Sequence, residues 1–160
     1  MKKQLIVLFC AMLSIGAIAQ TNEHALGLRL GGGNYFGAEV SYQRGLSNTN
    51  RLEADLGLSS YSNGSGFNLA GIYHWVWNIE GGFNWYAGPG AQIGSWSYKS
   101  GKDGDRSSGV YLGLGGQVGV EYNFEEIPLN LSVDTRPMFG IGNTYNDFNF
   151  GISFGLRYVF

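Results

Sequence analysis

Nine charged side chains recur through the sequence at positions whose neighbours are mostly apolar or small. Four are arginines and five are carboxylates: Arg29, Glu39, Arg51, Glu53, Asp55, Glu121, Asp134, Arg136 and Arg157. Guanidinium and carboxylate groups form strong, charge-assisted hydrogen bonds with one another. Such a set predicts either an internal ladder of salt bridges or a relay for protons or ions. The salt-bridge ladder is the simpler interpretation, and the relay remains an alternative.

Two other stretches invite a search for chemistry. The loop GKDGDRSSG contains Asp103 and Asp105, but an EF-hand loop needs a glutamate at its twelfth position, where this chain has Leu114. The run GGGN at residues 31–34 has no helix predicted after it, so it indicates a turn and not a phosphate cradle. We therefore predict no catalytic residue, no bound metal and no cofactor.

The segments that position the charges alternate between apolar and polar residues with a period of two, which is typical of β-strands. Eight segments are predicted: residues 24–30, 36–44, 51–59, 67–77, 83–94, 110–123, 129–137 and 148–160. The connections alternate between short turns and longer loops rich in glycine, serine and asparagine, so turns and loops gather at opposite ends. Pro89 cannot donate to a strand ladder, so it predicts a local bulge in the fifth segment.

The N-terminus is predicted to be a signal peptide covering residues 1–19. Lys2 and Lys3 precede an almost wholly apolar run that ends in a small-x-small cleavage pattern before Gln20. Residues 20–160 would then form one domain without cysteine, since Cys10 lies within the leader. Removing the two lysines takes the formal net charge from −2 to −4, which is too mild to indicate a nucleic-acid partner.

The distribution of charge between the two strand faces predicts an inside-out barrel. One face of the alternation is apolar and holds no charge, while the opposite face carries all nine charged residues. In a transmembrane barrel the apolar face meets lipid and the polar face lines the interior. Eight strands enclose a space that side chains just fill, so we expect a closed interior. Aromatic residues near both strand ends predict two interfacial belts.

The last residues add a family resemblance. Phe154, Leu156, Tyr158 and Phe160 alternate with smaller or polar residues and resemble the C-terminal signature of Gram-negative outer-membrane barrels. The mature chain as a whole resembles the small OmpA/OmpX-type barrels. The resemblance implies an all-β, eight-stranded antiparallel up-and-down transmembrane β-barrel with a polar, side-chain-filled interior. It also implies a monomer in the outer membrane, contacts with lipid and lipopolysaccharide, and recognition by the barrel-assembly machinery.

The expected function is non-enzymatic and serves envelope integrity or surface interaction through the loops. The loops after the fifth and seventh strands are the best binding candidates. Their predicted contact residues are Trp96, Tyr98, Phe139 and Tyr145. This expectation rests on analogy, because a fold does not fix a function.

Three alternatives remain open. Some small outer-membrane barrels modify lipid A with a histidine and a serine near the outer leaflet, but His24 and His74 are both expected toward the periplasmic side, His24 as a frayed residue at the start of the first strand. A narrow channel through the interior is the second alternative. The third is a secreted, lipocalin-like binder, in which the apolar face would point inward.

Overall fold

The structure, a computed structural model, describes residues 21–31, 37–61, 64–100, 105–141 and 148–160. These residues form strands joined by turns, and no helix among them is long and apolar enough to cross a membrane. The strands are β1 (His24–Gly31), β2 (Gly37–Ser47), β3 (Asn50–Tyr61), β4 (Gly64–Glu80), β5 (Phe83–Ser100), β6 (Asp105–Asn123), β7 (Leu129–Thr135), β8 (Met138–Ile141), β9 (Phe148–Asn149) and β10 (Ile152–Val159).

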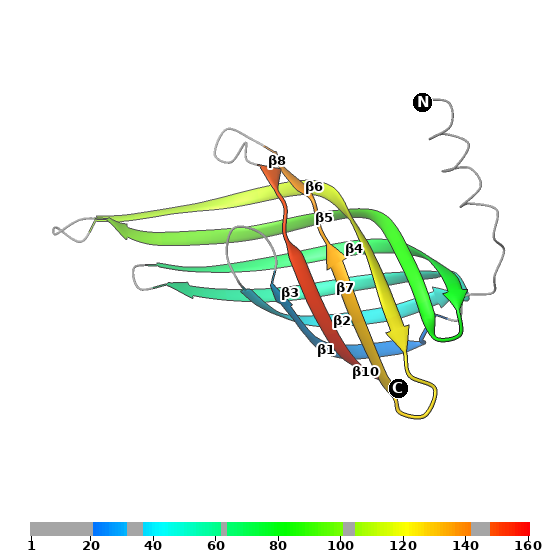
Figure 1. Cartoon of the computed structure of the whole chain (residues 1–160). Coiled ribbons are helices and arrows are strands. Elements are labelled where there is room, and N and C mark those ends of the chain that lie inside the picture. Colours follow the sequence, from blue (N-terminus) through cyan, green and yellow to red (C-terminus); the bar gives the residue numbers. More distant parts are fainter. Residues whose placement is uncertain (1–20, 32–36, 62–63, 101–104, 142–147) are drawn as a thin grey trace, which may run out of the picture.

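The strands close into one antiparallel barrel (Figure 1). Each strand from β1 to β6 pairs with the next, β6 pairs with β7, β7 with β10, and β10 with β1. β8 continues the line of β7 after Arg136 and Pro137 and pairs with the same strand, β6. β9 and β10 likewise follow one line and are separated by two residues. Counting β7 with β8 and β9 with β10, the barrel has eight strands. The predicted up-and-down eight-stranded barrel is confirmed.

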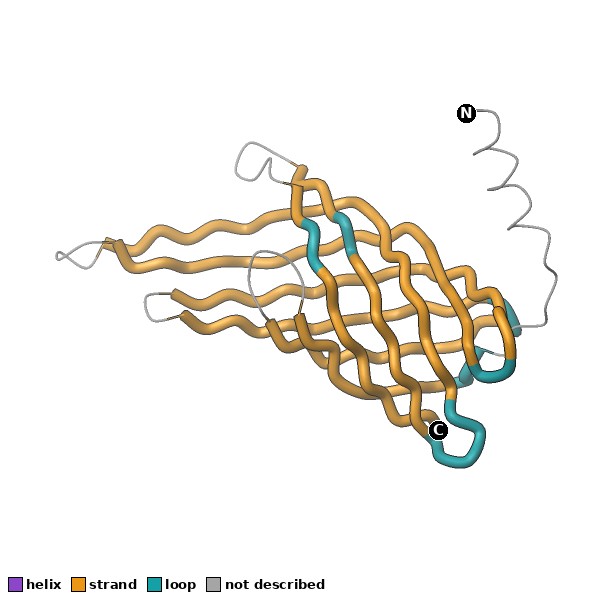
Figure 2. Tube along the Cα trace, viewed as in Figure 1, coloured by secondary structure: helices purple, strands orange, loops and turns teal. Residues whose placement is uncertain are grey.

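Short turns gather at one end of the barrel, as predicted (Figure 2). Two-residue turns join β2 to β3 and β4 to β5, and residues 124–128 join β6 to β7. Gly81 has a φ of 52°, a left-handed conformation that glycine adopts without a Cβ penalty. Asn78 Nδ2 donates to the carbonyl oxygen of Gly81 at 2.8 Å, which fixes this turn.

At the opposite end, two hairpins project beyond the rest of the barrel (Figure 1). The gaps between the predicted segments, at residues 60–66, 95–109 and 138–147, were expected to be loops, and this was wrong for residues 60–61, 64–66, 95–100, 105–109 and 138–141, which are strand. β3 and β4 continue pairing to Tyr61 and Gly64, and β5 and β6 to Ser100 and Asp105. β5 has 18 residues against 8 in β1, a difference of about 33 Å at about 3.3 Å per residue. Ladder hydrogen bonds sustain these strands although serine and glycine, which are typical of loops, make up much of them.

Pro89 does not produce the predicted bulge. Ile72 pairs with Gly90 and Trp75 with Ala87, so β4 and β5 keep one register on both sides of the proline. The ladder simply omits the two intervening pairs, because proline has no N–H to donate. β5 and β6 pair continuously through this position, which keeps the barrel wall closed.

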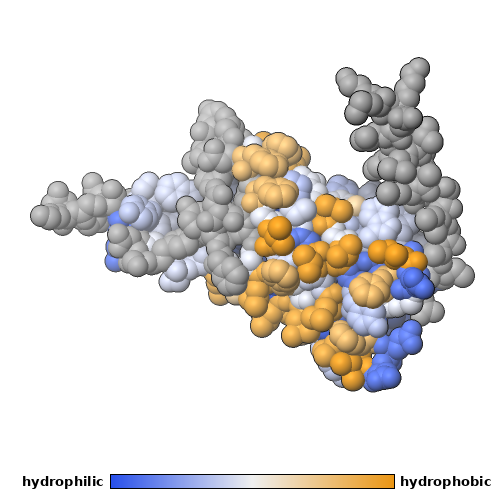
Figure 3. Space-filling model, in the orientation of Figure 1, coloured by the Kyte–Doolittle hydropathy of each residue, from blue (hydrophilic) through white to orange (hydrophobic). Residues whose placement is uncertain are grey.

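The two faces of the barrel wall have the predicted inverted polarity. The fully buried side chains are mostly polar or charged, and seven of the predicted nine are less than 4% exposed: Arg29, Arg51, Glu53, Asp55, Glu121, Asp134 and Arg157. Leucines, valines and phenylalanines cover the outer wall, where Leu28 is 51% exposed and Phe154 is 61% exposed. Figure 3 shows this apolar surface over the middle of the barrel, with hydrophilic residues at the turn end.

Aromatic rings form a belt near the turn end. Trp77 stacks on Trp85 with ring centroids 4.2 Å apart, and Phe83 contacts Tyr122 at 4.5 Å. His24 completes the belt at the seam between β1 and β10. Its ring stacks on Phe160 at 5.6 Å, and its Nδ1 lies 2.8 Å from the hydroxyl of Tyr42. The expectation of a frayed His24 was therefore wrong, because cross-strand neighbours hold the ring.

Candidate functional site: the barrel interior and the projecting hairpins

One half of the interior network is centred on Arg29 of β1. Its Nη1 donates to Glu39 Oε2 at 2.7 Å, and its Nη2 donates to Asp134 Oδ1 at 2.5 Å. The hydroxyl of Tyr86 donates to the other oxygen of Asp134 at 3.1 Å. β1, β2, β5 and β7 supply these side chains, so the contacts cross the lumen and do not follow one strand pair.

A second group of arginines converges on two carboxylates of β3. Arg157 Nη2 donates to Glu53 Oε2 at 3.1 Å, and Arg136 Nη2 lies 3.8 Å from Glu53 Oε1. Arg136 also forms an ion pair with Asp55 and reaches Glu39 Oε2 at 3.3 Å. Glu39 therefore links both groups into one network, as the salt-bridge interpretation predicts.

Neutral side chains satisfy much of the remaining hydrogen-bonding capacity, and they were not among the nine residues predicted for the network. Gln43 and Gln117 donate to the two oxygens of Glu53 at 2.5 and 3.0 Å. Ser41 and Ser132 accept from Arg157 at 2.9 and 2.8 Å. All four lie on the strand face that carries the charges, so their parity in the alternation is the signal that could have identified them.

Arg51 builds a separate cluster nearer the turn end. Its Nη1 lies 2.7 Å from Glu121 Oε2, and its guanidinium carbon lies 4.6 Å from the ring centre of Tyr86. Arg51 Nε donates to His74 Nδ1 at 3.3 Å, and His74 itself is fully buried. Among the described residues, no serine forms a hydrogen bond with His74. This geometry suits a structural histidine and lacks the His–Ser pair of an acyl-transfer site.

Large side chains fill the lumen because small residues face them. A Cβ on Gly119 would lie 2.7 Å from the hydroxyl of Tyr86, and one on Gly155 would lie 2.6 Å from Arg157 Nη1. Real Cβ atoms do not approach other atoms so closely, so a larger residue at either position would have to displace these side chains. The interior therefore holds packed, paired side chains across its width.

The predicted loop contacts that the structure describes do not come together as one site. Trp96 and Tyr98 belong to β5 within the projecting hairpin, on the inner face of the strand. Phe139 lies on the outer face of β8, where it is 61% exposed and contacts the ring of Phe148 at 4.9 Å. Tyr145 lies outside the described residues. Of the three described contacts, Trp96 and Tyr98 share a surface and Phe139 lies on another.

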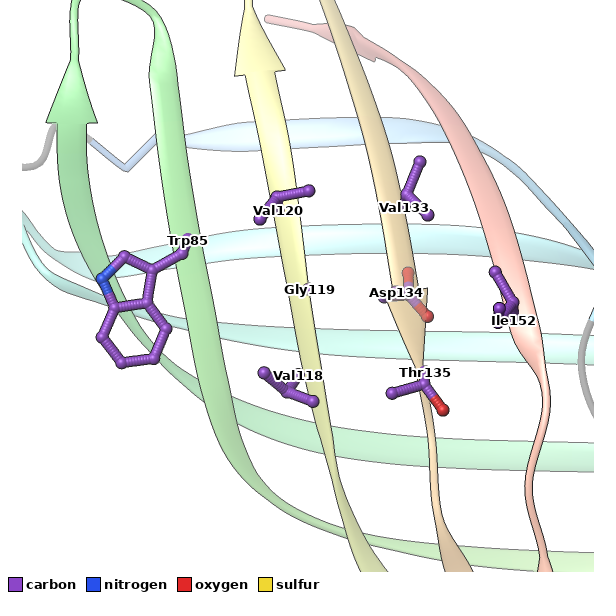
Figure 4. A pocket seen from close by; sticks show the side chains of 8 residues that line it. All are labelled: Trp85, Val118, Gly119, Val120, Val133, Asp134, Thr135 and Ile152. Atoms are coloured by element: carbon purple, nitrogen blue, oxygen red, sulfur yellow. The ribbon is translucent and has the colours of Figure 1, made fainter. Parts of the chain in front are cut away.

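A shallow hollow of about 300 Å³ lies on the outer wall (Figure 4). Apolar side chains of β5, β6, β7 and β10 line most of it, among them Trp85, Val120 and Ile152. Asp134 is the one ionisable residue in the lining, and its carboxylate is committed to Arg29 and Tyr86 inside the barrel. The hollow therefore presents no acid–base pair to the outside.

The architecture matches that of several solved barrels. Neisserial surface protein A superposes with a TM-score of 0.63 at 18% identity, covering 86% of this chain and 94% of that protein. The N-terminal β-barrel domain of Pseudomonas aeruginosa OprF gives 0.62 at 16%, covering 88% and 100%. Ail, the attachment invasion locus protein of Yersinia pestis, gives 0.60 at 14%, covering 86% and 96%.

The chain has the fold of the small eight-stranded outer-membrane barrels. No family model and no curated protein matches its sequence. The likeness is thus carried by strand number, closure and the alternation of faces, at identities where specific residues and functions do not transfer.

Proposed function

We propose that the protein is an integral outer-membrane β-barrel without enzymatic activity, with its projecting hairpins at the cell surface. In this role it supports envelope integrity or takes part in surface interactions. The barrel would be monomeric and surrounded by lipid and lipopolysaccharide. The barrel-assembly machinery would recognise the outward-facing Phe154, Leu156, Tyr158 and Phe160 during insertion.

The inverted polarity of the wall is the observation that carries this proposal. Large apolar side chains cover the outside while ion pairs occupy the inside. In water this arrangement would expose the apolar surface and bury the charges, with no gain from either. In a bilayer the apolar outer wall contacts lipid, and the closed part of the barrel has no free sheet edge.

The contents of the lumen favour a structural role over a channel or a lipid A enzyme. Arg29, Arg136 and Arg157 reach across the interior and are each paired with a carboxylate. His74 is enclosed between Arg51 and Tyr86, away from the outer wall. The names of similar barrels support a surface role. One is a neisserial surface protein, and another is the attachment invasion locus protein Ail, which has also been solved in complex with the heparin analogue sucrose octasulfate.

Matched cysteine variants test the placement and the orientation together. Ser60→Cys lies on a projecting hairpin and Glu126→Cys lies in the β6–β7 turn, both at exposed positions. In intact Gram-negative cells, a membrane-impermeant maleimide should label Ser60→Cys. It should label Glu126→Cys only after the outer membrane is permeabilised. Recovery of folded protein in a soluble fraction, or the reverse labelling pattern, would refute the proposal. Heat-modifiable gel mobility serves as the check on folding.

A further inference from the structure

The inner face of the β5–β6 hairpin carries a ladder of aromatic side chains that lie on glycines. Tyr111 of β6 pairs with Gly94 of β5, and a Cβ on Gly94 would lie 2.4 Å from the Tyr111 ring. Trp96 pairs with Gly109, where a Cβ would lie 2.9 Å from the indole nitrogen. Each ring therefore covers the glycine opposite it on the neighbouring strand, in space that a larger residue would fill.

Hydrogen bonds to residues of the lumen show that these aromatic side chains lie on the inner face of the hairpin. The hydroxyl of Tyr111 donates to Asn68 Oδ1 at 3.3 Å, and Asn68 Nδ2 donates to Glu39 Oε1 at 3.2 Å. Glu39 belongs to the interior network through Arg29. Side chains two residues apart on a strand share a face, so Trp96 and Tyr98 continue this inner face outward beyond the barrel.

Exposure rises along the ladder toward the tip of the hairpin. Tyr111 and Trp96 are partly buried, while Tyr98 is 48% exposed. Tyr98 Cδ2 lies 3.5 Å from where a Cβ on Gly64 would be, so its ring reaches over β4. Trp96 and Tyr98 are separated by about 6.6 Å along the strand. The result is an aromatic surface at the mouth of the barrel.

The described side chains of this face are uncharged. Besides the rings they offer small residues, hydroxyls and an amide: Ser59, Gly64, Gly66, Asn68, Gly94, Ser107 and Gly109. Lys99 is exposed, but its place in the alternation assigns it to the opposite face. Among its described side chains, the inner face thus offers no cation to a sulfated or phosphorylated ligand.

We propose that this surface, formed by Trp96, Tyr98, Tyr111 and Asn68, binds a neutral oligosaccharide. The C–H face of a pyranose ring packs on an aromatic face, and its hydroxyls exchange hydrogen bonds with amide and hydroxyl groups. Tyrosine and tryptophan suit this contact because each has a rigid apolar body and a polar edge. The assignment rests on the proposed function, since it requires the hairpins to stand outside the cell.

Binding of the detergent-refolded full chain to immobilised neutral, sialylated and sulfated oligosaccharides tests the assignment. We expect the protein to bind neutral oligosaccharides. The neutral oligosaccharide that binds most strongly is then titrated against the protein in solution. Tyr98→Ala and Trp96→Ala should each weaken this binding about tenfold or more. Gly109→Val should weaken it too, because the added side chain displaces the indole, whereas Lys99→Ala should leave it unchanged.

Two outcomes overturn the inference. One is a lack of binding to every neutral oligosaccharide by protein that shows the heat-modifiable mobility of a folded barrel. The other is binding restricted to sulfated or sialylated members and lost in Lys99→Ala. Either result leaves the outer-membrane placement intact if the Ser60→Cys and Glu126→Cys labelling behaves as expected. Failure of that labelling removes the proposed function separately.

Discussion

The barrel interior and the projecting hairpins are built from the same strands but held by different forces. In the lumen, side chains such as Arg157 and Glu53 pair across the full width of the barrel. In the hairpins, the backbone ladder carries the structure and rings such as Trp96 rest on glycine. A change in the lumen therefore disturbs several strands at once, while a change on a hairpin remains local. This difference separates what stabilises the molecule from what it presents to partners.

The largest expected effect comes from breaking the lumen network. Arg157→Leu leaves Glu53 with Arg136 at 3.8 Å as its remaining cation and removes the contacts to two serines. We expect the free energy of unfolding to fall by about 3–5 kcal/mol, because a buried carboxylate loses its main partner. Urea unfolding in phospholipid vesicles measures this. Arg44→Leu, at an exposed position, is the control and should change it by less than about 0.5 kcal/mol.

The outer wall should tolerate charge less well than the hairpins do. Leu28→Arg places a cation at the middle of β1, between Leu156 and Val40 on the adjacent strands. In a bilayer this should cost about 2–4 kcal/mol, whereas Ser60→Arg on a hairpin should cost less than about 0.5 kcal/mol. The same unfolding assay compares the two. Equal, small costs would mean that the wall faces water.

A smaller effect is expected from the aromatic belt. Trp77 and Trp85 stack with an interplanar angle of 17°. Their coupling in a double-mutant cycle with alanine should be about 0.5–1.5 kcal/mol, the contribution of an aromatic pair beyond its buried area. Simple additivity of the two single variants would show that the rings contribute only as separate interfacial anchors.

The smallest effect is expected on the hairpin itself. Tyr98→Ala removes a half-exposed ring that lies beyond the closed part of the barrel. The free energy of unfolding should change by less than about 0.5 kcal/mol, even though the proposed saccharide contact is lost. If Tyr98→Ala lowered the free energy of unfolding as much as Arg157→Leu, the hairpin and the lumen would form one cooperative unit. The distinction drawn between them would then be wrong.

Strand faces could be predicted from the sequence because the alternation has only two phases. Arg29, Asp134 and Arg157 all lie inside, as their parity required. Their partners could not be predicted, since Arg29 meets Asp134 and Arg157 meets Glu53 only through the stagger of a closed barrel. Sequence patterns fix the direction of a side chain, whereas the pairing across a lumen depends on the register of every strand between.

The length of β5 and β6 was missed for a related reason. Ser97, Ser107 and Gly109 are typical of loops, yet each lies in register within a continuous ladder. The stabilising features are the hydrogen bonds of the hairpin backbone and the fit of Trp96 on Gly109, neither of which appears as a run of apolar residues. The aromatic surface at the mouth was therefore visible in the sequence only as two separate aromatic residues.

The seam between β1 and β10 has a consequence for assembly. Ala25 pairs with Val159 and Gly31 with Ser153, so the first strand synthesised must find one of the last. Until they meet, the sheet has two unpaired edges, each able to template a strand of another molecule. Contacts between residues so distant in the chain slow folding. During folding, closure of the barrel thus competes with mispairing between a free edge and a neighbouring polypeptide. A chaperone would be most useful if it protected the edges of β1 and β10 until they pair.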